Sequence, residues 1–280
     1  MSQSLSSESS AHRTLSLAHL SLIASPPHQL VALAAEAGFA GVDLRLSPAT
    51  PTDRVYDDNE RMQLCHGLLP LLRQTGLKVW DVEIIRINER IRAEDHLPLM
   101  EAASLLGARR IKAVCDCSDP ALSAALLARL AELAAPFGLT VDLEYMVFSG
   151  VKSLRAALAI VEAAAQPNLQ VLVDALHWIR AGDTAADIRA APPGRIGYVQ
   201  LCDGPARGPV GREALIAEAR TNRLLPGDGE FPLRALLEAM PPSCPISIEV
   251  PLLSGENPLH HARRLLAAAR RVTERQEAAP

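Results

Sequence analysis

Eight short apolar segments alternate with longer amphipathic ones along most of the chain, and this alternation limits the fold more than any other feature. Most of the apolar segments are continuous runs without a strict in–out alternation, which is typical of parallel strands that helices cover. The pattern predicts eight strands, in the runs that begin at Leu15, Gly41, Leu77, Arg109, Leu139, Leu169, Arg195 and Cys244.

The longer segments between these runs are expected to be helices. Several end on a glycine just before the next strand, as in AEAGFAGVDL, because glycine accepts the left-handed conformation that closes a helix. Eight strand–helix units in about 260 residues predict an α/β fold, a single (β/α)8 TIM barrel. An open doubly wound sheet is the alternative, but it normally carries a glycine-rich phosphate loop after its first strand. The clearest predicted helices are Pro27–Ala37, Asn59–Thr75, Ala121–Ala135, Lys152–Ala165 and Pro258–Val272.

The chain divides into a barrel with a short tail at each end. We expect a flexible tail over residues 1–13, the barrel over residues 14–275 and a C-terminal tail over residues 276–280. Two long connections interrupt the regular spacing: SPATPTDRVYDDNE after the second strand, and the stretch from DGPARG to PGDGEF after the seventh. Both would lie at the C-terminal face, where barrels build active sites, so we expect them to be lids.

Composition excludes several functional classes. The formal net charge is −4 and only 3% of the residues are aromatic, which argues against a nucleic-acid-binding protein. The N-terminus lacks the apolar core of a secretory signal, and no uncharged apolar run approaches the roughly 20 residues that span a bilayer. The five cysteines have no disulfide-like or CxxC spacing, which indicates free thiols. We therefore expect a cytoplasmic protein that binds neither nucleic acid nor membrane, with a homo-oligomer left open.

Polar side chains stand at the C-terminal ends of the last four predicted strands. Glu144 ends LTVDLE, Asp174 ends LQVLVD, Gln200 lies in IGYVQLCD and Glu249 ends PISIE. Closing the barrel would bring them around one axis, where three buried carboxylates would repel each other. A divalent cation relieves this repulsion, and an all-oxygen set favours Mn²⁺ or Mg²⁺, with Co²⁺ or Zn²⁺ as alternatives. For each residue alone, a solvent-facing or helix-capping role is an equal alternative.

Other residues are candidates for binding a substrate. Glu83 ends LKVWDVE and His19 ends LSLAH, so both are expected to line the same mouth. Arg207, in the connection after the seventh strand, has the charge to meet a carboxylate or phosphate, although a solvated loop arginine is the more common case. Cys115 and Cys117 are interpreted as core or loop thiols rather than as a soft metal site.

These residues resemble those of the sugar phosphate isomerase/epimerase-like enzymes of the xylose-isomerase-like TIM-barrel superfamily. The resemblance covers roughly residues 15–271 and rests on LEYM, VDALHW, VQLCD, LPGDGEF and ISIEV. It implies that the four strand-end residues hold one divalent metal ion, and that His177 of the D-x-x-H motif contacts the oxygens of the substrate. Asp203 matches the last position of the family's H-x-K-D motif and is a further candidate for substrate binding.

One motif departs from the family pattern. Where H-x-K-D is usual, this chain reads Gln200-Leu201-Cys202-Asp203. An amide can still offer a carbonyl oxygen, so metal binding is retained, but Cys202 removes a cation. Some dehydratases of the superfamily, including bacterial 3-dehydroshikimate dehydratases, resemble this chain in using Gln at that place. The resemblance therefore leaves two enzyme classes open.

A metal ion beside two glutamates indicates chemistry next to a carbonyl group. The ion would stabilise an enolate as a Lewis acid, Glu144 and Glu249 would take and return the α proton, and His177 would position a hydroxyl. We therefore predict a metal-dependent isomerase or epimerase of a small polyhydroxylated carbonyl substrate. If a β-hydroxyl leaves instead, the same site is a dehydratase of a cyclic keto-polyol. A non-catalytic ligand-binding barrel is the third alternative.

Overall fold

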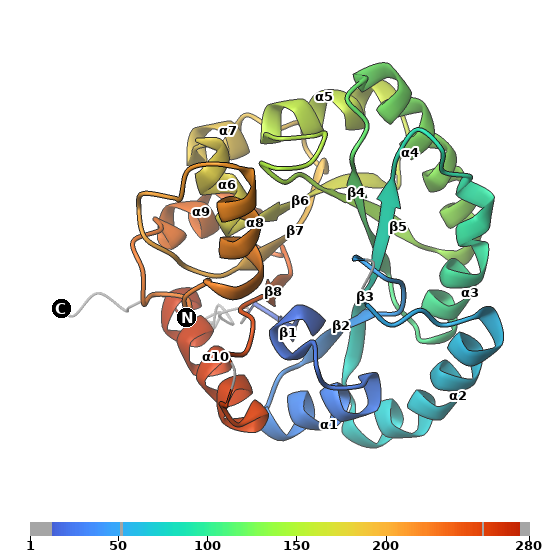
Figure 1. The fold of residues 1–280 in the computed structure, drawn as a ribbon, viewed down its shortest axis with the longest axis vertical. Coiled ribbons are helices and arrows are strands. Elements are labelled where there is room, and N and C mark those ends of the chain that lie inside the picture. The colour runs from blue at the N-terminus through green and yellow to red at the C-terminus, as the bar shows by residue number, and fades with distance from the viewer. Residues whose placement is uncertain (1–12, 51–52, 254, 275–280) are drawn as a thin grey trace, which may run out of the picture.

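Eight parallel strands close into a barrel in the order in which they occur along the chain (Figure 1). The computed structural model describes residues 13–50, 53–253 and 255–274. All eight predicted strands are present, so the (β/α)8 barrel is confirmed and the open sheet is wrong. The strands are β1 (Leu15–Leu17), β2 (Gly41–Arg45), β3 (Lys78–Ile87), β4 (Arg110–Cys115), β5 (Thr140–Glu144), β6 (Leu169–Asp174), β7 (Ile196–Leu201) and β8 (Ile246–Ile248).

Helices surround the barrel, as Figure 1 shows. The five helices predicted from the sequence are found with each end within two residues of the expected position. Gly38 and Gly76 end two of them with φ of +93° and +72°, the conformation that only glycine adopts at low cost. The helices are α1 (Pro27–Ala37), α2 (Asp58–Thr75), α3 (Leu97–Leu105), α4 (Pro120–Ala134), α5 (Leu154–Ala164), α6 (Ala175–Ala181), α7 (Ala185–Arg189), α8 (Arg212–Thr221), α9 (Leu233–Ala239) and α10 (Pro258–Thr273), with short 3-10 turns η1 (His19–Leu22), η2 (Ala93–His96) and η3 (Ala135–Phe137).

The segment 120–137, which is α4 with η3, is apolar and long enough to cross a bilayer by length and composition alone. In the barrel it is a packed core helix, because Leu127, Leu130 and Ala134 are buried against the hydrophobic core. Arg129 and Glu132 interrupt it, so it is not an uncharged run. All five cysteines are free and buried, as expected for thiols of the core. The cytoplasmic location stays a prediction.

The structure describes most of the first long connection and all of the second. In the first, residues 51–52 lie outside the described residues, as do the tails over 1–12 and 275–280. The second contains a helix that the glycines and prolines around it conceal in the sequence, α8. A buried ion pair fastens α8 to α6, with Arg180 Nη2 2.6 Å from Glu218 Oε1. We call residues 204–231 the β7–α9 segment.

Candidate metal and active site

The strand-end residues meet because the strands are staggered. Glu144 pairs with Leu172, two residues before Asp174, whereas Asp174 pairs directly with Gln200. Gln200 in turn pairs with Ser247, two residues before Glu249. This stagger is the shear that a closed barrel requires, and it turns a row of strand ends into a ring around the axis.

Three carboxylates form the centre of this ring. One oxygen from each of Glu144, Asp174 and Glu249 lies within 4.8 Å of the other two, and all three residues are buried. The expected convergence of these side chains is therefore observed. Buried carboxylates at such distances need a positive charge among them.

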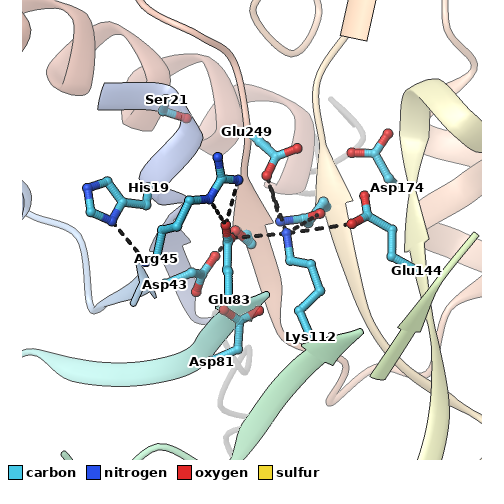
Figure 2. A network of polar contacts seen from close by, with 12 residues as sticks. His19, Ser21, Asp43, Arg45, Asp81, Glu83, Lys112, Glu144, Asp174 and Glu249 are labelled. Carbon is cyan, nitrogen blue, oxygen red and sulfur yellow. Dashed lines mark hydrogen bonds and ion pairs between the residues drawn. The ribbon is translucent and has the colours of Figure 1, made fainter. Parts of the chain in front are cut away.

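Lys112 supplies one such charge from β4. Its Nζ lies 3.0 Å from Glu83 Oε1, 3.4 Å from Glu249 Oε1 and 3.8 Å from Glu144 Oε2, as Figure 2 shows. Burial alone would lower the pKa of Lys112, but Glu249, Glu83 and Glu144 outweigh it and raise the pKa well above its usual value. The sequence reasoning missed this residue, although a lysine inside the apolar run RIKAVC is a signal that it faces the barrel interior.

Arg223 supplies a second charge from the β7–α9 segment. Its Nη1 lies 2.6 Å from Asp174 Oδ2, and its Nη2 lies 3.0 Å from Glu249 Oε2. The Nε–H donates to the main-chain oxygen of Ala219, which is part of α8. The sequence reasoning missed Arg223 as well, because nothing in a connection rich in arginine marks the one that turns inward.

The carboxylates of the ring differ in protonation. Burial raises the pKa of Glu144 to about 8; Lys112 opposes this rise, while Glu249 and Asp174 reinforce it. For Asp174, burial also acts to raise the pKa, but Arg223 outweighs it and the pKa lies below its usual value. Without a metal ion, Glu144 therefore holds a proton at neutral pH and Asp174 does not.

Gln200 lies beside the ring with its amide fully buried. Its Nε2 donates to Glu249 Oε1 at 3.2 Å, and its Oε1 accepts from Lys112 Nζ at 3.3 Å. As a metal ligand it would offer the carbonyl oxygen in place of the contact with Lys112. Its role as the fourth ligand stays a prediction.

His177, on α6 one turn after Asp174, has an unused nitrogen. Its Nδ1 is buried and has no hydrogen-bond partner among the described residues. The imidazole ring of His177 meets the phenyl ring of Phe148 edge-on, with the two ring centroids 5.2 Å apart. Burial lowers the pKa of His177 to about 4, despite Asp174 nearby, so the imidazole is neutral and able to contact a polar ligand.

A second group of acidic side chains surrounds Glu83 inside the barrel. Oxygens of Asp43, Asp81 and Glu83 lie within 4.8 Å of each other (Figure 2). Burial acts to raise the pKa of Glu83, but Lys112 and Arg45 lower it to about 2. Burial raises the pKa of Asp43 to about 7 and that of Asp81 well above its usual value. Glu83 is therefore the member of this group that is fully ionised at neutral pH, and it joins the group to the ring through Lys112.

Three other predicted substrate contacts lie outside the ring. Both ring nitrogens of His19 are used locally: Nδ1 accepts from the Arg45 amide and Nε2 contacts the Ser25 carbonyl. Asp203 is buried, and its carboxylate accepts from the amides of Gly204, Gly227 and Phe231, which organises the β7–α9 segment. Arg207 is exposed on that segment. Their proposed contacts with a substrate stay predictions.

Two clefts open at the C-terminal face of the barrel. One of about 330 Å³ is lined by His19, Arg45 and Tyr56 among others. The other, of about 670 Å³, lies between the end of β3, the loops after β4 and β5, and the start of α8. Phe148 in its wall contacts the imidazole ring of His177. Three cationic side chains line this second cleft against one acidic residue, Asp116: they are Arg86, Lys152 and Arg212.

The donor set fits a hard divalent cation. Three carboxylate oxygens converge, an amide lies beside them, and no thiol or imidazole is among the converging groups described. Mg²⁺ and Mn²⁺ prefer such oxygen ligands. Glu144, Asp174 and Glu249 would hold the ion, with Gln200 as the fourth candidate.

Comparison with known proteins agrees with this architecture. The family model described as "Xylose isomerase-like TIM barrel" matches residues 31–272. The chain belongs to this family. The resemblance inferred from the strand-end motifs is thus confirmed, and members of the family include enzymes of more than one class.

Proteins similar to this xylose isomerase-like barrel include a dehydratase related in sequence and an epimerase similar in fold. A 3-dehydroshikimate dehydratase of Pseudomonas aeruginosa is 30% identical over 242 residues, which are 84% of this chain but only 37% of that protein. The solved structure of the IolI protein with a bound zinc atom has a TM-score of 0.76 at 16% identity, covering 95% and 100% of the two chains. A D-allulose 3-epimerase of Methylomonas sp. has a TM-score of 0.67 at 17% identity, covering 93% and 98%. These two structures are similar in fold.

Proposed function

We propose that this barrel is a divalent-metal-dependent dehydratase of a carboxylated cyclic keto-polyol such as 3-dehydroshikimate. The observation that carries the proposal is an amide, Gln200, beside three converging carboxylates at the place of the third metal ligand. The Pseudomonas aeruginosa relative, a dehydratase, supports the same class. Mn²⁺ or Mg²⁺ is the proposed ion, because the donors are oxygens.

The charge around the site favours an acidic substrate. The cleft of about 670 Å³, whose wall residue Phe148 contacts His177, is lined by Arg86, Lys152 and Arg212. Arg86 is paired with Asp116 at 2.6 Å, so Lys152 and Arg212 are the cations left to meet a substrate anion. A carboxylate on the substrate would be attracted to these groups, whereas a neutral sugar would gain nothing from them. This excess of positive charge supports a dehydroshikimate-like substrate over an uncharged ketose.

The reaction needs a base, an acid and no oxidant. Removal of the hydrogen next to the ring carbonyl and loss of the hydroxyl on the following carbon release one water, and the ring then becomes aromatic by tautomerisation. A bound divalent ion would supply Lewis-acid stabilisation of negative charge on the carbonyl oxygen. Glu249 is proposed to take the α proton at its carboxylate, since it is the ring carboxylate at the C-terminal end of β8.

The other side chains orient the substrate. The unpaired Nδ1 of His177 is placed to hydrogen-bond a substrate hydroxyl, and its neutral state makes it an acceptor or a donor rather than a fixed charge. Lys112 keeps Glu249 and Gln200 in place from below through contacts of 3.4 and 3.3 Å. The β7–α9 segment carries Arg223 into contact with two ring carboxylates, and we propose that it also helps to exclude water.

The test is direct conversion of 3-dehydroshikimate by the Mn²⁺-loaded protein. The absorbance of an aromatic catechol acid is expected to increase. The mass of this product is expected to be lower than that of the substrate by one water. Glu249→Gln is expected to lose turnover by roughly 10²–10⁴-fold, the usual contribution of a proton-transfer group. Glu94→Gln is the matched control, because Glu94 is exposed and pairs with Arg129 on the outside of the barrel. A metal-loaded protein that forms no aromatic product refutes the dehydratase.

An isomerase or epimerase of polyhydroxylated ketones is the second candidate. The observation in its favour is that Glu144 and Glu249 belong to the same ring, so that one carboxylate is available to take a proton and another to return it. Incubation of ketohexoses in D₂O distinguishes the two classes. Deuterium at the carbon next to the carbonyl, with a new stereoisomer and no loss of water, selects the epimerase. If the protein binds a ligand but catalyses neither reaction, the non-catalytic ligand-binding barrel is the interpretation that remains.

A further inference from the structure

Arg223 bridges two of the three carboxylates that a metal ion would need. Its guanidinium contacts Asp174 Oδ2 at 2.6 Å and Glu249 Oε2 at 3.0 Å, and it also donates to the main-chain oxygen of Glu249 at 3.4 Å. The side chain is only 2% exposed. A cation that belongs to the chain therefore occupies the oxygens of the ring.

The cations of the chain nearly balance the carboxylates of the buried centre before any metal ion is added. With all four carboxylates ionised, as metal ligands must be, they face three cations for a formal charge of 3 − 4 = −1, which a divalent ion would turn into +1. Metal–oxygen distances of about 2.0–2.2 Å would place the ion within about 5 Å of the guanidinium, where like charges repel strongly in a buried site. If one cation leaves, the sum returns to 0. The groups are Glu83, Glu144, Asp174, Glu249, Arg45, Lys112 and Arg223.

Arg223 is the cation that is able to leave. Lys112 is on the central strand β4 and contacts four partners inside the barrel, and Arg45 pairs with Glu83 away from Asp174. Arg223 instead stands just after α8, and its Nε is bonded to Ala219 of the same segment. Moving it needs no change in the barrel itself.

We propose that Arg223 and the divalent ion occupy Asp174 and Glu249 alternately, so that Arg223 sets the metal affinity of the site. Its departure on metal binding also releases the end of α8 from the ring, which links metal occupancy to the packing of the β7–α9 segment. The inference rests on the proposed function only in that the ring takes a divalent ion. It does not depend on which reaction follows.

The test compares Mn²⁺ dissociation constants of the wild type, Arg223→Met and Arg129→Met. Removal of the competing guanidinium is expected to tighten Mn²⁺ binding roughly 10- to 100-fold, as expected for a buried charge pair. Arg129→Met removes the same charge from an exposed pair and is expected to change the constant less than about twofold. Arg223→Lys, which cannot bridge two carboxylates, is expected to be intermediate and covers the case in which Arg223→Met does not fold without metal.

A second readout follows the β7–α9 segment. Trypsin sites at Arg207, Arg212 and Arg220 are exposed on it. Mn²⁺ is expected to speed cleavage there in the wild type and to have no such effect in Arg223→Met. Unchanged or weaker Mn²⁺ binding in Arg223→Met, while the wild type binds one ion, overturns the competition and leaves the proposed function intact. Mn²⁺ binding in Arg223→Met but not in the wild type supports the competition. Mn²⁺ binding in neither protein overturns both the competition and the proposed function.

Discussion

The affinity of the carboxylate ring for a divalent ion is expected to fall steeply between pH 8 and pH 6. Burial raises the pKa of Glu144 to about 8, with Lys112 opposing the rise and Glu249 and Asp174 reinforcing it. A protonated carboxyl is a poor ligand, so metal binding must release this proton. The pKa of His177 is about 4 and that of Asp174 is lowered, so neither titrates in this interval.

The magnitude follows from one coupled proton. With a pKa of about 8, Glu144 is half ionised at pH 8 and about 1% ionised at pH 6, so the apparent affinity falls roughly 50-fold, or about 2 kcal/mol. Asp43, with a pKa of about 7, is the other carboxyl that titrates here, and it lies in the second acidic group rather than in the ring. A variant is needed to separate the two.

Calorimetric titration with Mn²⁺ at pH 6, 7 and 8 measures this effect, and two buffers of different ionisation enthalpy count the protons released. Glu144→Gln is the matched variant: it is expected to bind more weakly and with much less dependence on pH. An affinity in the wild type that changes less than about threefold over the interval, without proton release, refutes the assignment of the proton to Glu144. The same pH dependence in Glu144→Gln would assign the released proton to Asp43 instead.

Four further outcomes are expected. Asp174→Ala removes a ligand and is expected to abolish metal binding, measured by elemental mass spectrometry beside the wild type. Gln200→His is expected to keep the ion and shift preference from Mn²⁺ toward Zn²⁺ in competition titrations. Lys112→Met leaves Glu83 and its neighbours undercompensated and is expected to lower the free energy of unfolding by about 3–5 kcal/mol in urea. In EDTA, because the folded pKa of Glu144 (about 8) exceeds its usual 4.5, the free energy of unfolding is expected to decrease as pH rises from 4.5 to 8, visible as a falling urea midpoint.

The barrel could be predicted from the sequence because its signals are local. A run such as GVDLR is apolar enough to be a buried strand, and α1 begins at Pro27 and ends before Gly38 as its sequence indicates. The helix α8 could not be found in this way. It is exposed on one side and rich in charge, and its attachment depends on Arg180, more than 30 residues earlier in the chain.

The carboxylates of the ring could be predicted because strand ends of a barrel must meet. The stagger that brings Glu144 and Glu249 level with Asp174 could not, since it depends on the shear of the closed sheet. The partner charges were missed for the same reason. The apolar run around Lys112 indicates that it turns inward, but which carboxylates it meets is decided by contacts between residues as far apart as Lys112 and Glu249, and nothing near either residue in the sequence records the pair.

The cation that the motif comparison marks as missing is supplied from another strand. The usual H-x-K-D lysine is replaced by Cys202, which is buried and whose thiol pKa burial raises, so it brings no charge. Lys112 on β4 places its ammonium 3.3 Å from Gln200 Oε1 and 3.4 Å from Glu249 Oε1. Every strand of a closed barrel faces the same axis, so a lysine on β4 can place its charge at the ring as a lysine on β7 would. The electrostatic requirement belongs to the ring as a whole, and a motif read along one strand cannot show whether it is met.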